Sequence, residues 1–487
     1  MSSFAKNIFT LSAGNIVAQV ISIGLMPLIT RLYDPNAFGV FALYMSIVMV
    51  LFPVSTLRFN SAIVLPESNR DASALLLLSV FSVCVSALIL IPAFLIVLQS
   101  FGWDGGLLGR FIWIIPIGVL IQGLFQSVNF WAIRNKCYKS MCIASISESV
   151  TDRSLVISLA LLKEVAPISL ISGRIVGPLI SLAIIVRQSV LPSMHLIKSS
   201  ANWYEMKRLA YRYKDFPIFS SWSFLASALS REFPTILLAI FYTPIIAGLY
   251  GLGLRVMNMP MMLIGDSVAK AFLQKAAVEK EESDKLEEKV RKLLVYALIL
   301  ILPFSIIIVF FGREIFSFLF GEQWVNAGSI VQILMVVIVF LFLYRIVSVL
   351  FDVYEKQRQR LVFDFLMLVA RSMPLVLVAF TGGSYLNAIT FMAIASVFVY
   401  ILSFSYLFSL VNLDFNLLVV DVLIKFMAFV PFVLVMYFIS AMANLHGIIL
   451  MIVLVGFAML QYVVILFTDE YLRDTVMNFY KQVKVSR

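Results

Sequence analysis

Arg31-Leu32-Tyr33-Asp34-Pro35-Asn36-Ala37-Phe38-Gly39-Val40-Phe41-Ala42-Leu43 joins two long apolar segments near the start of the chain. A second stretch, Ile240-Phe241-Tyr242-Thr243-Pro244-Ile245-Ile246-Ala247-Gly248-Leu249-Tyr250-Gly251-Leu252, also joins two apolar segments, and it repeats the Tyr, Pro, Gly, aromatic and Leu residues of the first at a constant separation of 209 positions. In each stretch the proline ends one helix and lets the next begin, and the glycine permits close packing at the start of the second helix. The pattern indicates two related membrane halves.

The composition is that of an integral membrane protein. Of the 487 residues, 62% are hydrophobic and 13% are charged, and the mean hydropathy is +1.00, whereas soluble proteins carry about 25% charged residues. The net charge of +10 does not indicate nucleic acid binding, because the positive residues lie in loops between apolar runs and form no stripe with aromatic residues. We expect membrane orientation to explain the charge.

Cysteine and histidine residues give no indication of metal or disulfide chemistry. Their spacing fits neither a metal site nor a disulfide framework, and we expect packing or loop roles for Cys84, Cys137, Cys142, His195 and His446. We expect no metal and no cofactor. The apolar run 8–30 is too long for the core of a signal peptide, so we predict a retained helix there.

The chain contains fourteen segments of the roughly 20 apolar residues that a helix needs to cross a bilayer. They cover residues 8–31, 38–57, 72–98, 111–133, 141–162, 168–190, 216–241, 246–269, 293–311, 328–351, 361–380, 387–410, 418–441 and 447–467. The predicted fold is all-α, a polytopic membrane protein with about 14 transmembrane helices. Two repeat-related six-helix lobes would be followed by two extra C-terminal helices that contact lipid.

The predicted domains are an N-lobe (1–190), a cytoplasmic interfacial linker (191–215), a C-lobe (216–410) and helices 13 and 14 with the tail (411–487). The linker mixes basic and aromatic residues, as is typical of a helix at the level of the lipid headgroups. Of the 37 Lys and Arg residues, 26 fall in the termini and alternate loops of one side and only 4 in the loops of the other. By the positive-inside rule both termini are cytoplasmic.

Three predicted helices carry polar residues at spacings of three and four, which places them on one helix face. They are Ser12, Asn15, Gln19 and Ser22 in the first helix, Gln122, Gln126 and Asn129 in the fourth, and Ser220, Ser223, Ser227 and Arg231 in the seventh. Single residues of this kind commonly form hydrogen bonds between packed helices. Taken together, and with two stripes at equivalent places in the repeat, they favour a water-filled cavity between the halves.

Charges near the centres of the predicted helices need an explanation, because each costs about 2.5 to 3.5 kcal/mol to insert. They comprise the arginines Arg153, Arg174, Arg231, Arg255, Arg345 and Arg371 and the acids Glu148, Asp152, Glu232, Asp266 and Asp364. Ion pairs between helices are one interpretation. For the arginines we favour phosphate binding, because guanidinium binds phosphate through paired hydrogen bonds and keeps its charge; Arg345 lies near a helix end and can snorkel.

Three motifs carry a resemblance to a known family: 31–39, Ser55-Thr56-Leu57-Arg58-Phe59-Asn60-Ser61-Ala62-Ile63-Val64-Leu65-Pro66, and Tyr213-Lys214-Asp215-Phe216-Pro217. The chain resembles the polysaccharide transporters of the multidrug/oligosaccharidyl-lipid/polysaccharide exporter superfamily, in particular the Wzx-type O-antigen flippases. The resemblance implies a bacterial inner-membrane protein that moves an undecaprenyl-pyrophosphate-linked oligosaccharide from the cytoplasmic to the periplasmic leaflet by alternating access. Many such flippases have twelve helices, whereas lipid II flippases have two more that form a lipid groove.

The resemblance also gives roles to the polar and charged residues. The predicted pyrophosphate- and sugar-binding residues are Arg153, Arg174, Arg231, Arg255, Arg371, Asn15, Gln19, Gln122, Gln126, Ser223 and Ser227. The candidates for ion coupling are Glu148, Asp152, Asp266 and Asp364. The implied partners are the lipid-linked oligosaccharide, membrane lipids, a polysaccharide polymerase and a chain-length regulator.

Two alternatives remain open at this point. A multidrug exporter driven by Na⁺ or H⁺ would need an acid-centred cation site, which Glu148, Asp152 and Asp364 could supply and which the arginines oppose. A membrane-embedded polymerase or ligase would be expected to carry catalytic groups on a sizeable external loop, and the predicted outer loops are short. We therefore expect a transporter rather than an enzyme.

Overall fold

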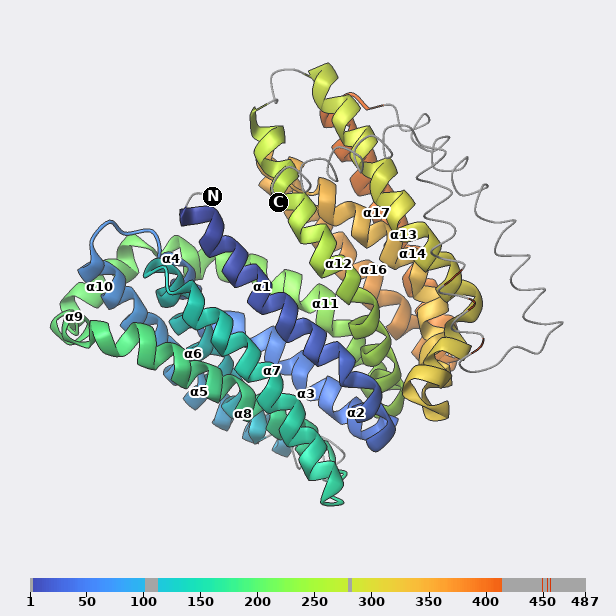
Figure 1. Cartoon of the computed structure of the whole chain (residues 1–487), viewed down its shortest axis with the longest axis horizontal. Helices are drawn as coiled ribbons and strands as arrows, with labels where there is room; N and C mark the ends of the chain where they lie inside the picture. The colour runs from blue at the N-terminus through green and yellow to red at the C-terminus, as the bar shows by residue number, and fades with distance from the viewer. Residues whose placement is uncertain are drawn as a thin grey trace, which may run out of the picture. The chain divides into compact units, whose positions relative to one another are not determined.

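The computed structural model describes residues 3–100, 113–278 and 283–413, together with residues 449, 453 and 456 (Figure 1). Within these ranges the chain is helical and has no strand. The predicted helices 418–441 and 447–467 lie outside the described residues, apart from those three positions.

Seventeen α-helices make up the described chain. They are α1 (Ser3–Gly24), α2 (Met26–Leu32), α3 (Pro35–Ser55), α4 (Phe59–Ala62), α5 (Asn69–Ser100), α6 (Ile114–Arg134), α7 (Tyr138–Leu161), α8 (Pro167–Ile185), α9 (Met194–Ser199), α10 (Trp203–Arg212), α11 (Ser221–Phe241), α12 (Pro244–Val278), α13 (Ser283–Phe320), α14 (Val325–Val347), α15 (Leu350–Val353), α16 (Gln357–Phe380) and α17 (Tyr385–Leu410). Short 3-10 or π turns join some of them: η1 (Val186–Val190), η2 (Leu191–Ser193), η3 (Phe216–Ser220) and η4 (Glu322–Trp324).

Ten helical segments of the described chain are long and apolar enough to cross a membrane. Each of the first twelve predicted segments coincides with a helix. Ten of these twelve are the segments just mentioned, and the other two are α7 and α12. Helix α7 is not among the ten because it carries too many charged residues: Glu148, Asp152 and Arg153 in addition to Lys139. The prediction of an all-α, multi-pass membrane protein is confirmed, while the count of fourteen helices stays a prediction.

The two repeated stretches fold alike, each as a helix start. Asp34 caps α3, because its Oδ1 accepts a hydrogen bond from the backbone N–H of Ala37 at 2.7 Å, and Pro35 takes the first helical position. Pro244 begins α12 in the same way, after Thr243, whose Oγ1 accepts from the backbone N–H of Ile246 at 3.3 Å. The helix start that the repeat predicts at each proline is therefore present in both stretches.

The two helix starts also contact each other through their glycines. A Cβ atom on Gly39 would overlap the carbonyl group of Pro244, and one on Gly248 would overlap the carbonyl oxygen of Pro35. Backbone meets backbone at this crossing with no room for a side chain. The glycines of the two repeats are thus required by the same contact.

The chain divides into two compact units, which we describe separately. Unit 1 comprises residues 1–252 and 361–388, and unit 2 comprises 253–360 and 389–487. In unit 2, α13 and α14 pack closely at Gly312 and Gly328, where a Cβ on Gly328 would overlap the backbone of Gly312. The lobe boundaries predicted from the sequence stay a prediction.

The linker 191–215 belongs to unit 1 and is largely helical. Met206 and Leu209 of α10 are buried in a cluster with Leu75 of α5 and Ile197 of α9. The opposite face of α10 is exposed, as Tyr204 shows with an exposed fraction of 75%. Helix α10 of the linker is thus docked on α5.

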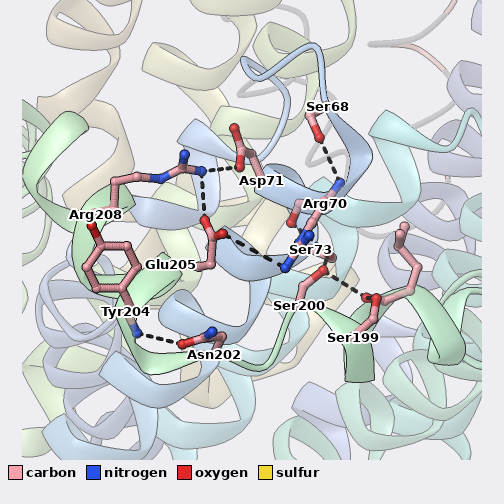
Figure 2. A network of polar contacts seen from close by, with 11 residues as sticks. Ser68, Arg70, Asp71, Ser73, Ser199, Ser200, Asn202, Tyr204, Glu205 and Arg208 are labelled. Atoms are coloured by element: carbon pink, nitrogen blue, oxygen red, sulfur yellow. Dashed lines mark hydrogen bonds and ion pairs between the residues drawn. The ribbon is translucent and has the colours of Figure 1, made fainter.

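Polar contacts reinforce this docking (Figure 2). Nη2 of Arg208 lies 2.7 Å from Oδ1 of Asp71 and 2.8 Å from Oε2 of Glu205. The hydroxyl of Ser73 donates a hydrogen bond to that of Ser200 at 2.7 Å. The linker is therefore attached to the first turns of α5 by charge and hydrogen bonding as well as by apolar packing.

Candidate functional site

A buried charge cluster lies between α7 and α8 in unit 1. The carboxylate of Asp152, only 3% exposed as a residue, has Nε of Arg174 at 3.5 Å and Nη2 of Arg153 at 3.9 Å from its Oδ2. Arg153 is 5% exposed. One carboxylate thus lies between two guanidinium groups inside a membrane helix pair, where each charge offsets the cost of burying the other.

Glycines on α8 make this cluster possible. A Cβ on Gly173 would overlap the Asp152 side chain, and one on Gly177 would lie 3.1 Å from the backbone oxygen of Glu148. The close approach places Glu148 and Asp152 of α7 against the helix that carries Arg174. With Arg153, this region holds two positive and two negative side chains, so its formal charge is zero.

The polar stripe of α1 lies against α7 at one point. Ser22 Oγ donates to Ser149 Oγ at 3.4 Å, which is the helix-to-helix hydrogen bonding expected of small polar residues in membranes. Farther along α1, Gln19 is half-buried and Asn15 is exposed. The side chain of Ser12 lies outside the described residues.

The polar stripe of α11 leads to an arginine. Ser223, Ser227 and Arg231 follow one another at intervals of four residues, and Nη1 of Arg231 donates to Ser227 Oγ at 2.7 Å. Arg231 and Ser223 are exposed, whereas Ser227 is half-buried. The stripe therefore presents hydroxyl groups and one guanidinium on a single face.

Helices α3 and α16 add further polar contacts to α11 within unit 1. Ser46 of α3 donates through its hydroxyl to Oε2 of Glu232 at 2.9 Å, and Nη1 of Arg371 of α16 donates to the backbone oxygen of Ser230 at 3.3 Å. We call Ser46, Ser227, Arg231, Glu232 and Arg371 the α11 polar group.

The α11 polar group has the chemistry of an anion site. Two arginines with a single carboxylate are positioned by hydroxyl and carbonyl oxygens on membrane-spanning helices. Guanidinium binds phosphate in a two-pronged geometry. Both arginines also have interactions beyond the two hydrogen bonds given above. The sequence places Arg231 and Arg371 correctly in helices but gives no indication that Ser46 joins this group, because its contact with Glu232 arises from helix packing.

The remaining predicted residues are dispersed. In unit 1, Gln122 and Gln126 of α6 and Asp364 of α16 are half-buried. In unit 2, Arg255 is half-buried, as is the nearby Asn258. The side chain of Asp266 lies outside the described residues. Within the described part of the chain no group of three or more His, Cys, Asp or Glu residues is placed to hold a metal ion.

Comparison with solved structures gives the fold. The chain is similar to the lipid II flippase MurJ in an inward closed conformation, with a TM-score of 0.70 and 12% identity over 96% of this chain and 99% of that one. It is also similar to a multidrug resistance MATE family transporter of the MOP superfamily in an outward-facing conformation (TM-score 0.55, 13% identity, 84% of this chain and 96% of that one). A MATE protein in complex with MaD3S gives a TM-score of 0.53 at 15% identity, over 84% and 96% of the two chains.

Comparison of sequences gives the family. No curated protein matches the chain significantly. A family model described as polysaccharide biosynthesis protein matches residues 28–329, a range that begins just before the first repeated stretch and ends in α14. The chain therefore belongs to the polysaccharide biosynthesis protein family and has the fold of the MOP superfamily transporters.

Proposed function

We propose that this protein is a flippase for an undecaprenyl-pyrophosphate-linked oligosaccharide, such as an O-antigen repeat unit. It works by alternating access in the bacterial inner membrane, with both termini in the cytoplasm, and moves the headgroup from the cytoplasmic to the periplasmic leaflet. The driving force comes from an ion that binds at one of the acidic residues Glu148, Asp364 or Asp266. Asp152, the fourth residue predicted for ion coupling, lies beside Arg153 and Arg174 and is assigned to helix packing. A polysaccharide polymerase and a chain-length regulator act on the delivered units.

The observation that carries the proposal is the α11 polar group in a chain of the polysaccharide biosynthesis family. A pyrophosphate-linked sugar is too hydrophilic to cross a bilayer without a polar path, whereas its polyprenyl tail remains in the lipid. Arg231 and Arg371 suit the pyrophosphate, and the hydroxyl and amide groups of Ser223, Ser227, Gln122 and Gln126 suit sugar hydroxyls. Asn15 and Gln19 extend the sugar-binding set on α1.

The structure supports different roles for the predicted arginines. Arg153 and Arg174 share the Asp152 carboxylate, which supports a structural role for them. Arg231 is exposed at the end of the α11 stripe, which supports a direct contact with substrate. Arg255 stays in the proposed set as a residue of unit 2.

A complementation experiment tests the function. A strain that lacks its own O-antigen flippase but has every other biosynthetic enzyme is supplied with this protein, with the Arg231→Ala variant or with no protein. We expect surface polysaccharide only with the unmodified protein and accumulation of the lipid-linked unit in the other two strains. Absence of surface polysaccharide with correctly inserted, unmodified protein, in strains that supply several different repeat units, contradicts the proposal.

A second candidate is a cation-coupled multidrug exporter. The similarity in fold to the MATE transporters and the carboxylates of α7 support it. The arginines of the α11 polar group oppose it, because a cavity for cationic drugs would favour acidic residues over guanidinium groups. Drug resistance conferred on a sensitive strain, without any effect on surface polysaccharide, would favour this candidate.

A further inference from the structure

Arg58 lies at the joint between α3 and α4, outside the membrane-spanning helices. Leu57 and Arg58 both have left-handed backbone conformations, with φ of 47° and 58°, which side chains of this size adopt only where the surroundings hold them. The hydroxyl oxygen of Thr56 accepts a hydrogen bond from the backbone N–H of Arg58 at 3.2 Å. The direction in which the Arg58 side chain leaves the backbone is therefore fixed by the turn.

The Arg58 guanidinium packs on an aromatic ring. Its Cζ lies 3.8 Å from the ring centroid of Phe224 in α11. Within the described ranges no carboxylate lies within ion-pair distance of Arg58, and its buried Nε has no hydrogen-bond partner. Burial lowers the pKa of the Arg58 guanidinium. This contrasts with Arg153, Arg174 and Arg208, each of which has a carboxylate nearby.

Two neighbours of Arg58 also have polar atoms without partners. Asn60 is only 2% exposed, and neither its Oδ1 nor the buried hydroxyl of Ser61 has a hydrogen-bond partner in the described structure. Buried polar groups are nearly always hydrogen-bonded, because leaving them unpaired is costly. Three such groups within four residues indicate a segment that is completed by a polar ligand.

We propose that Arg58, stacked on Phe224, is an anion subsite that binds the phosphate groups of a lipid headgroup at the start of the α11 polar face. This inference rests on the proposed function for the identity of its ligand. The proposed orientation, from the positive-inside rule, has the turn between α3 and α5 on the cytoplasmic side. Arg58 therefore contacts the pyrophosphate of the substrate before Arg231 does.

The geometry of α11 supports a transfer from one arginine to the next. Phe224, Ser227 and Arg231 occupy positions i, i+3 and i+7 and therefore share one helix face. Seven residues of α-helix correspond to about 10 Å, and the Arg231 guanidinium reaches back one turn to Ser227, so an anion can move from the first guanidinium to the second along the same face. The substrate headgroup leaves Arg58, passes Ser227 and reaches Arg231, and the stack on Phe224 keeps the first guanidinium in place while the site is empty.

Binding measurements on the full-length protein test the subsite. The protein is reconstituted in phosphatidylcholine nanodiscs, and its affinity for undecaprenyl pyrophosphate is measured for the unmodified protein and for Arg58→Gln, Arg58→Lys, Phe224→Leu and Arg231→Gln. Arg70→Gln is the matched control, because Arg70 lies in the same turn region but is exposed and only 3.9 Å from Glu205. We expect at least a tenfold loss for Arg58→Gln, a smaller loss for Arg58→Lys and Phe224→Leu, and no change for Arg70→Gln.

The outcomes separate the subsite from the function. Unchanged affinity in Arg58→Gln together with a loss in Arg231→Gln overturns the subsite and leaves the proposed function intact. If the unmodified protein does not bind undecaprenyl pyrophosphate but binds phosphatidylglycerol through Arg58, the anion subsite is supported with a phospholipid headgroup as its ligand, and the proposed function fails. Absence of Arg58-dependent binding to either lipid overturns the subsite.

Chemical modification of the unmodified protein gives a second measurement that does not depend on the folding of a variant. Phenylglyoxal modifies arginine guanidinium groups, and the extent of modification of each arginine is mapped by peptide mass spectrometry. We expect inorganic pyrophosphate to slow modification of Arg58 several-fold and to leave that of Arg70 unchanged. Equal modification of Arg58 with and without saturating pyrophosphate overturns the proposal.

Discussion

Two groups of membrane-embedded arginines in unit 1 differ in what surrounds them. On α7 and α8, Arg153 and Arg174 lie beside the carboxylate of Asp152, and Arg153 is 5% exposed. On α11 and α16, Arg231 and Arg371 donate to a serine hydroxyl and a backbone carbonyl, and Arg231 is exposed. The first group is a neutral, buried cluster, whereas the second combines two arginines with Glu232 and includes the exposed side chain of Arg231 on a hydroxyl-bearing helix face.

On the proposed function, this difference separates structural from functional charge. A buried guanidinium whose charge is balanced by a carboxylate contributes to helix packing, and removing either member leaves the other charge uncompensated. An exposed guanidinium on a hydroxyl-bearing face can exchange its contacts for those of a phosphate. The two groups should therefore respond to substitution in opposite ways, the first in stability and the second in transport.

The largest effect is expected from Asp152→Asn. The substitution leaves Arg153 and Arg174 beside a neutral amide in the membrane interior, and the loss of a buried partner costs about 3 to 5 kcal/mol. We expect a strong decrease in thermal stability and in the yield of monodisperse protein. Replacing the exposed Glu164, in the loop between α7 and α8, by Gln is the control and should change stability little. Normal stability with abolished transport would assign the α7–α8 cluster to the mechanism instead.

Arg231→Ala should have the next largest effect, on transport. A charge-assisted hydrogen bond contributes about 1.5 to 3 kcal/mol, so we expect a decrease of roughly 10- to 100-fold in the flipping rate in proteoliposomes. The melting temperature should change little because the side chain is exposed. Arg231→Lys should recover part of the activity, since lysine keeps the charge and loses the paired geometry. A large drop in stability would place Arg231 with the structural arginines.

Arg371→Ala should affect both properties moderately. The side chain is half-buried and holds the backbone oxygen of Ser230 at 3.3 Å, so its removal costs about 1 kcal/mol of packing and hydrogen bonding. We expect a decrease in flipping of about tenfold and a small decrease in thermal stability. Transport equal to that of the unmodified protein would restrict the anion site to α11.

The smallest effect is expected from Ser227→Ala. The hydroxyl accepts one hydrogen bond from Arg231 at 2.7 Å, and losing a single such bond costs about 1 kcal/mol. Flipping should decrease a few-fold, measured as above. In the Arg231→Ala background the same substitution should have less effect, because the two side chains act together. Additive losses would show that Ser227 contacts the substrate independently.

The helices could be predicted from the sequence because apolar length dominates in a bilayer. Twelve predicted segments coincide with helices, and the repeat of Pro35 and Pro244 located two helix starts. Pairing between charges could not be predicted in the same way. The sequence shows Asp152 one residue from Arg153, but Arg174 reaches Asp152 only because Gly173 lets α8 approach α7.

Arg58 shows a different limit of sequence reasoning. The sequence places it in a loop motif, where a positive residue is explained by membrane orientation alone. Its distinguishing features are the left-handed turn at Leu57 and the ring of Phe224, and both depend on contacts between segments that lie far apart in the chain. The presence of Arg58 inside a motif that carries the family resemblance was the one indication available.

The contact between Gly39 and Gly248 also determines how changes at these two positions combine. Each glycine faces the carbonyl group that begins the other repeat, so the contact resembles the self-complementary interface of a twofold dimer contained within one chain. Once either glycine carries a methyl group, the two backbones have already moved apart, and a second methyl group on the other glycine finds the space that the first has created.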